Sequence, residues 1–156
     1  MSDLPDVGLH LLDPRLPGWG FPRWGSASAA GLDLHACLEG PMDLPPQGAP
    51  SLIPAGFMVL IRDPAWCGLI FPRSGRGHRE GLVLGNGTGV IDADYQGPLM
   101  VSAWNRDAVA SIRIVPGERI AQLVFTRIAR PVLTVLEGEA VPESARGAGG
   151  FGSSGR

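Results

Sequence analysis

Short apolar runs follow one another along most of the chain and are separated by segments that contain glycine and proline. Apolar and polar residues alternate within many of these runs, which is typical of strands that are buried on one face. The predicted strands cover residues 7–12, 31–37, 51–53, 57–62, 67–71, 82–84, 90–95, 99–105, 111–115, 120–125 and 132–136. Because these strands are too many for one sheet, the pattern predicts an all-β protein, a jelly-roll-like β-sandwich, with a single short helix at residues 74–80.

Two stretches depart from the strand pattern. Residues 18–28 (GWGFPRWGSAS) form a loop with three aromatic side chains, which we expect to fold back onto apolar surface, and we assign it no chemistry. Residues 146–156 (RGAGGFGSSGR) are rich in glycine and lack any core-forming period. We therefore expect one domain at residues 1–145, followed by a flexible C-terminal arm at 146–156, for which a frayed tail is the alternative.

Composition and charge narrow the possible partners and the compartment. The net charge is −2 and all thirteen basic residues are arginine, so phosphate binding would need local clusters and coating of nucleic acid is not expected. Cys37 and Cys67 lie in apolar runs without metal-ligand spacing, which indicates buried, reduced thiols. The apolar runs are too short to cross a bilayer, and the N-terminus has no signal-peptide pattern. We expect a cytoplasmic protein that does not bind membranes.

The segment Gly89 to Gly97 (GVIDADYQG) places two carboxylates and a phenol within four residues. A half-buried strand with this sequence would aim Asp92 or Asp94 into a pocket, and burial of an unpaired carboxylate is costly unless it serves a function. The segment is therefore a candidate active site. A hairpin turn is the alternative, because Asp and Gly are common in turns.

Other segments carry the residue types that bind nucleotides. Arg73 and Ser74 in PRSG follow an apolar strand and could bind phosphate, although a capped turn is the commoner meaning of this pattern. Asn86 could read a base edge, or serve only as the Asn of an Asn-Gly hairpin. The arm offers backbone N–H groups, two hydroxyls and Phe151, but it lacks the lysine of a P-loop. Asp33 and His35 alternate with core residues, and we expect both to be exposed.

Five segments in order resemble the homotrimeric dUTPase family: AAGLDLHA (29–36), PRSG (72–75), GNGTGVIDADYQG (85–97), PGERIAQLVF (116–125) and RGAGGFGSSG (146–155). The resemblance implies Mg²⁺-dependent hydrolysis of dUTP to dUMP and pyrophosphate, which keeps uracil out of DNA and supplies the precursor of dTMP. It also implies a homotrimer whose sites are shared between subunits. The ten residues that separate Leu136 from Arg146 span about 33 Å when extended, so the arm could reach a neighbour.

The resemblance also implies a role for each matching residue. Asp92 would be the general base, Tyr95 would pack against the deoxyribose, and Asp33 would hold magnesium through water. Arg119 would position the catalytic segment. The uracil contacts would be Asn86, Gly87, Ile91 and Met100. The phosphate contacts would be Arg73, Ser74, Gly75 and Gln122, and the arm would add Arg146, Phe151 (stacked on uracil), Gly152, Ser153 and Ser154.

The chain departs from the family pattern at Leu32, where many relatives have Tyr, and at Arg76, which we expect to reach solvent rather than phosphate. The loop at 18–28 is also unusual. A dCTP deaminase, or a bifunctional deaminase and dUTPase, is the nearest rival interpretation, but IDADY lacks the catalytic Glu that it needs. A binding module without catalysis is the second rival, and retention of Asp92 argues against it.

Overall fold

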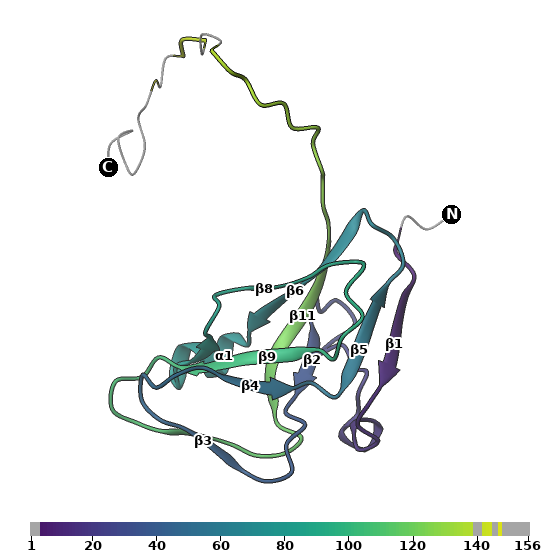
Figure 1. Ribbon diagram of the computed structural model, residues 1–156. Helices are drawn as coiled ribbons and strands as arrows, with labels where there is room; N and C mark the ends of the chain where they lie inside the picture. The colour runs from purple at the N-terminus through teal and green to yellow at the C-terminus, as the bar shows by residue number, and fades with distance from the viewer. Residues whose placement is uncertain (1–3, 139–141, 145–146, 148–156) are drawn as a thin grey trace.

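The computed structural model describes residues 4–138, 142–144 and 147. Within them the chain forms strands and one short α-helix (Figure 1). The elements are β1 (Val7–Leu11), the 3₁₀ helix η1 (Leu16–Trp19), β2 (Leu32–His35), β3 (Met42–Leu44), β4 (Ser51–Pro54), β5 (Phe57–Ile61), β6 (Trp66–Pro72), α1 (Ser74–Arg79), β7 (Leu82–Leu84), β8 (Gly89–Ile91), β9 (Met100–Asn105), β10 (Ile112–Ile114) and β11 (Arg119–Arg127). The arm residues Arg146, Phe151, Gly152, Ser153 and Ser154 lie outside the described residues.

The strands pair antiparallel throughout the described part of the chain. The largest sheet has the order β2-β11-β6-β8, and a second has the order β4-β9-β7. Two further pairs, β1-β5 and β10-β3, complete the architecture. Non-consecutive neighbours such as β2 and β11 require long crossovers, as in a jelly roll. The predicted all-β sandwich with one short helix is confirmed.

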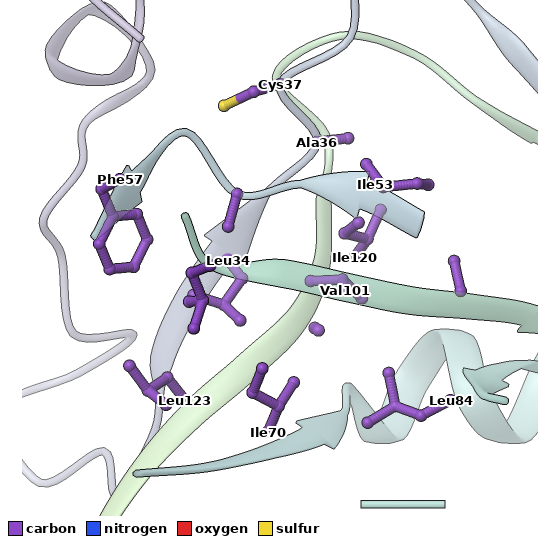
Figure 2. Close-up of a cluster of buried hydrophobic side chains, with 14 of the residues drawn as sticks. Leu34, Ala36, Cys37, Ile53, Phe57, Ile70, Leu84, Val101, Ile120 and Leu123 are labelled. Carbon is purple, nitrogen blue, oxygen red and sulfur yellow. The ribbon is translucent and has the colours of Figure 1, made fainter. Parts of the chain in front are cut away.

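The core lies between the two larger sheets. Figure 2 shows Leu34, Ile70 and Leu123 from the first sheet together with Ile53 and Val101 from the second. All five side chains are at most 3% exposed. Burial of each such side chain stabilises the fold by roughly 1.5–3 kcal/mol, so this cluster fixes how the sheets that carry the site are placed.

The structure differs from the predicted strands at two places. Met42–Leu44 forms β3, which the sequence pattern did not indicate because prolines flank it at positions 41 and 45; it pairs with β10. Residues 132–136 were predicted as a strand, but the structure has none there. Val132, Leu133 and Val135 are 94%, 86% and 84% exposed, because this segment leaves the body of the chain after β11 and pairs with no strand among the described residues (Figure 1).

The predicted strand at 90–95 is shorter than expected. β8 ends at Ile91, and the backbone then turns, with the N–H of Tyr95 donating to the carbonyl of Asp92 at 3.1 Å. Asp92 and Asp94 are both exposed in the single chain. The backbone at these positions therefore forms a turn, which was the alternative interpretation of the sequence. Neither carboxylate is buried within the single chain.

The aromatic loop covers one end of the core, as expected. Phe21 is 4% exposed and packs against Phe57, with ring centroids 4.6 Å apart. Trp19 stacks on His35 at 6.1 Å between centroids. The expectation that His35 is exposed was wrong: it is 5% exposed, and its Nδ1 lies 2.8 Å from the carbonyl oxygen of Gly117. Strand alternation places His35 on the polar face, but the loop covers that face.

The two cysteines are buried and free, as predicted. Burial raises the pKa of the Cys37 thiol to about 12, with the nearby charge of Asp13 contributing in the same direction. Burial and then the charge of Asp92 raise the pKa of the Cys67 thiol. Both groups are therefore protonated and unreactive at neutral pH, as core thiols are.

Candidate functional site

A cavity of about 610 Å³, called the large cavity below, opens on the described surface. It opens between the start of α1, the strands β2 and β11, and the end of the aromatic loop. Its lining residues are Gly25, Ala29, Ala30, Gly31, Asp33, Arg73, Ser74, Gly75, Arg76, Arg79, Arg119 and Gln122. Three of the sequence segments singled out above, at residues 29–36, 72–75 and 116–125, thus meet in one place.

Asp33 lies between two arginines at this cavity. Nε of Arg73 donates to Oδ1 of Asp33 at 2.9 Å, and Nη1 of Arg119 donates to Oδ2 at 3.0 Å. The side chain of Asp33 is 14% exposed. The expectation that Asp33 is merely exposed was therefore wrong, because two guanidinium groups from other segments cover its carboxylate. Charge-assisted pairs of this kind hold all three side chains in fixed positions.

A β-bulge places Arg119 at the cavity. The register between β11 and β2 shifts between Arg119 and Ala121. Without the shift, Arg119 would share the core face of β11 with Ala121 and Leu123, since side chains alternate with a period of two. The bulge instead lets Arg119 reach Asp33 on the outer face, while Ile120 remains buried.

Gln122 occupies the floor of the cavity. Its Nε2 donates to the carbonyl oxygen of Pro72 at 2.9 Å, which links β11 to the residue just before Arg73. A Cβ atom at position 31 would crowd Oε1 of Gln122, so glycine leaves room for this amide without a shift of its side chain. Gly31 thus keeps the amide of Gln122 next to the PRSG segment.

Arg76 pairs with two carboxylates, and the expectation that it reaches solvent was wrong. Its Nη1 donates to Glu118 at 2.5 Å and its Nη2 donates to Glu80 at 2.7 Å. Its side chain is only 13% exposed. Arg76 therefore ties α1 to the turn that precedes Arg119, and the sequence offered no sign of this because Glu118 lies 42 residues away.

Asn86 and Met100 meet at a separate, smaller cavity of about 80 Å³. Its other lining residues are Leu52, Ile70, Leu84, Gly89 and Ser102. Asn86 is exposed in the turn between β7 and β8, and Gly87 in that turn has a φ of +73°. Ile91 is buried at the end of β8 and does not line this cavity. Asn86 therefore belongs to the hairpin turn between β7 and β8 and also lines a cavity.

Asp92 and Tyr95 lie apart from the large cavity. Ile91 pairs with Gly68, and Arg73 follows Gly68 by five residues along and just beyond β6. Antiparallel pairing places Asp92 opposite Cys67, six residues before Arg73, so at about 3.3 Å per residue Asp92 and Arg73 are roughly 20 Å apart. Tyr95 is 42% exposed, and its hydroxyl donates to the carbonyl oxygen of Pro98 at 3.0 Å. One chain therefore does not bring the carboxylate of Asp92 to the arginine cluster.

The sequence analysis assigned no role to Arg79, which lines the large cavity, and expected Arg76, which also lines it, to reach solvent. Arg79 follows Gly75 by one helical turn, so both residues lie on the same face of α1. That spacing was readable once residues 74–80 were predicted to be helical. A second cavity of about 420 Å³ adjoins the first at Asp33 and Arg119, and Trp19, Arg23 and His35 also line it.

The described residues contain no group of three His, Cys, Asp or Glu side chains arranged to bind a metal ion. Over the same part of the chain, no helix is long and apolar enough to cross a membrane.

Comparisons with known proteins agree with this fold. A dUTPase family model matches residues 19–155. The deoxyuridine 5'-triphosphate nucleotidohydrolase of Xanthomonas oryzae pv. oryzae (strain MAFF 311018) is 55% identical over 148 residues, which cover 94% of this chain and 93% of that protein. The corresponding protein of Xanthomonas campestris pv. campestris (strain B100) is 54% identical over 148 residues, covering 94% of this chain and 95% of that protein.

Solved structures of dUTPases have the same fold as this chain. The Staphylococcus bacteriophage 80alpha dUTPase, solved with dUpNHpp, superposes with a TM-score of 0.81 at 29% identity, covering 97% of this chain and 99% of that one. A mutant dUTPase of phage phi11 of S. aureus, described as coordinating a structural Mg(II) ion, shares the fold with a TM-score of 0.72 at 24% identity, covering 85% of this chain and 97% of that one. The family model spans most of the chain and the relatives exceed half identity, so the chain belongs to the dUTPase family.

Proposed function

We propose that this chain, a dUTP diphosphatase by its family, hydrolyses dUTP to dUMP and pyrophosphate with Asp92 as the general base. Asp92 takes a proton from water, the water oxygen bonds to the α-phosphorus, and the bond from that phosphorus to the bridging oxygen of pyrophosphate breaks. General-base assistance contributes about 10²- to 10⁴-fold, so positioning and charge neutralisation supply the remaining acceleration.

The observation that carries the proposal is the arginine cluster around Asp33. Arg73, Ser74, Gly75 and Gln122 line one cavity of about 610 Å³, which has room for a triphosphate. Arg73 and Arg119 are held by the same carboxylate, so their guanidinium groups are oriented before substrate arrives. Such preorganised cations stabilise charge that develops on phosphate oxygens during the reaction. The arm residues Arg146, Phe151, Gly152, Ser153 and Ser154 would close over the nucleotide and exclude water.

The donor set at Asp33 suits a magnesium ion held through water. Each oxygen of the carboxylate already accepts one hydrogen bond from an arginine and retains a lone pair for a second. Hard oxygen donors are what Mg²⁺ prefers, and it commonly keeps several waters and binds substrate phosphates. When bound, Mg²⁺ neutralises negative charge on the phosphate oxygens. Asp33 would accept hydrogen bonds from water in that shell.

The nucleoside part of dUTP is proposed to bind at the hairpin between β7 and β8. The cavity that Asn86 and Met100 share would accept uracil, with the backbone of Gly87 and Ile91 completing the contacts. The exposed ring of Tyr95 would pack against the deoxyribose and leave no room for a 2'-hydroxyl. A narrow pocket of this kind selects dUTP over UTP and dTTP by steric exclusion.

A homotrimer would bring the separated parts of the site together. Asp92 and Arg73 lie at opposite ends of β6, so the base of one subunit must serve the phosphate cluster of another. The outer face of the β2-β11-β6-β8 sheet carries a stripe of incompletely buried apolar side chains. These are Leu69, Phe71, Val90 and Val124, which register places on the same face as Asp33 and Gln122. A partner docked on that stripe would border the large cavity.

The segment at 132–136 supports the same assembly. Its apolar side chains are almost fully exposed within one chain, and exposed apolar runs mark interaction sites. Contact with a neighbouring subunit would bury them and direct the arm to that neighbour's site. In the cytoplasm, the enzyme would keep uracil out of DNA and supply dUMP for dTMP synthesis.

The proposal is tested by pyrophosphate release from dUTP, dCTP, dTTP and UTP, with and without Mg²⁺. Wild type is compared with Asp92→Asn, and Asp94→Asn is the matched control because it removes an equally exposed carboxylate from the same turn. We expect Mg²⁺-dependent release from dUTP alone, lost in Asp92→Asn and retained in Asp94→Asn. Binding of dUTP without turnover by wild type would instead favour a binding module.

A further inference from the structure

Four arginines line the large cavity, and three of them are paired with carboxylates. Arg73 and Arg119 both donate to Asp33. Arg76 donates to Glu80 and Glu118. These pairs satisfy part of the donor capacity of each guanidinium group and neutralise much of its charge. The fourth arginine, Arg79, therefore adds a positive charge that no such pair offsets.

Arg79 makes no ion pair with any residue that the structure describes. Its Nη2 lies 3.2 Å from the position that a Cβ atom of Gly75 would occupy. The side chain thus folds back along α1 and places its guanidinium group over Gly75, beside the PRSG backbone. An alanine at position 75 would crowd this group, so the missing side chain makes room for it.

We propose that Arg79 is a further substrate-binding residue, which contacts the β- and γ-phosphates of dUTP; this inference rests on the proposed function. An unpaired guanidinium offers its full planar set of N–H donors, which match phosphate oxygens in pairs. In the proposed function, Asp92 of one subunit meets the α-phosphate, while Arg73, Ser74 and Gly75 of another bind the rest of the phosphate tail. Because the guanidinium group of Arg79 lies over Gly75, it would face the phosphates that leave as pyrophosphate.

The test compares Arg79→Gln and Arg79→Lys with wild type. Arg113→Gln is the matched control, because it removes the same charge from a surface pair with Asp43 outside the cavity. Steady-state pyrophosphate release gives KM and kcat for dUTP with Mg²⁺, and calorimetry gives the Kd of dUpNHpp and of dUMP. Melting temperature and oligomer mass are measured for every variant.

For Arg79→Gln we expect KM for dUTP and the Kd of dUpNHpp to rise about 10-fold, as for loss of one charge-assisted contact. The Kd of dUMP should stay within about twofold, because dUMP lacks the phosphates that Arg79 contacts. Arg79→Lys should recover part of the affinity, since it keeps the charge but loses the fork. Arg113→Gln should match wild type in all of these values.

Three results would overturn the inference: unchanged dUpNHpp affinity in Arg79→Gln, equal weakening of dUMP and dUpNHpp, or a loss of affinity that accompanies a lower melting temperature or a changed oligomer mass. Wild type that binds dUpNHpp but releases no pyrophosphate would contradict the proposed function alone. In that case, selective loss of dUpNHpp binding by Arg79→Gln would still support a phosphate contact by Arg79.

Discussion

Arg119 donates to Oδ2 of Asp33 across 86 residues of sequence, and a single β-bulge in β11 makes this contact possible. The other oxygen of Asp33 accepts from Arg73, which precedes α1, so one carboxylate organises two arginines from distant segments. Removal of this carboxylate leaves two guanidinium groups close together and unneutralised. Their mutual repulsion would displace both from the phosphate site.

Asp33→Asn should lower kcat at least about 10-fold and raise the Mg²⁺ concentration needed for half-maximal rate, because the acceptor for metal-bound water is weakened. The check is pyrophosphate release from dUTP across a magnesium titration. Asp43→Asn, which disrupts an exposed pair with Arg113, is the control. An unchanged magnesium dependence in Asp33→Asn would argue against a role for Asp33 at the metal.

Arg76→Met should lower the free energy of unfolding by about 1–2 kcal/mol, because Glu118 and Glu80 both lose a charged donor. Glu80→Gln should cost less, since the side chain of Glu80 is 43% exposed against 29% for Glu118. Urea denaturation of both variants measures the difference. A larger loss of unfolding free energy in Glu80→Gln than in Arg76→Met would show that the contact with Glu118 is not the stabilising one.

Acid should destabilise the fold through Asp13. The hydrogen bonds from Arg15 lower the pKa of Asp13 from 3.8 to about 2 in the folded chain. Because the folded pKa is depressed, the stabilising contribution is present above the unfolded value and is lost as pH falls from about 4 to 2. Asp13→Asn should be less stable at neutral pH but should show a flatter decline over that window. Urea midpoints between pH 2 and 6 check this, and parallel curves would contradict it.

Leu133→Asp should weaken subunit assembly although Leu133 is 86% exposed in the single chain. If residues 132–136 pack against a neighbour, the new carboxylate would be buried without a partner on assembly. Sedimentation across a concentration series measures the effect. Val109→Asp is the control, because Val109 is 87% exposed in a surface loop. Identical sedimentation of the two variants would place the segment outside the interface.

Deletion of residues 146–156 should reduce dUTP turnover strongly while the melting temperature stays within about 2 °C of wild type, because a closing arm adds no buried core. Turnover and thermal unfolding measured on the same preparation check both parts. Full turnover by the truncated chain would contradict the proposed role of the arm.

The sequence by itself determined most of the strands, the short helix, the buried cysteines and the family. These features follow from local patterns, since alternation and turn residues act over a few positions. The five segments that carry the dUTPase resemblance could likewise be read directly, and the family comparison confirms it. The catalytic and binding roles of Asp92, Tyr95 and Asn86 remain predictions.

Only the tertiary structure decided which of those residues meet. His35 is buried because the aromatic loop covers a face that alternation marks as polar, and Arg76 is paired because Glu118 folds next to α1. The register of β8 against β6 separates Asp92 from Arg73, and residues 132–136 find no partner strand in the part of the chain that the structure describes. Each of these outcomes depends on contacts between distant segments, which local hydrophobic patterns do not encode.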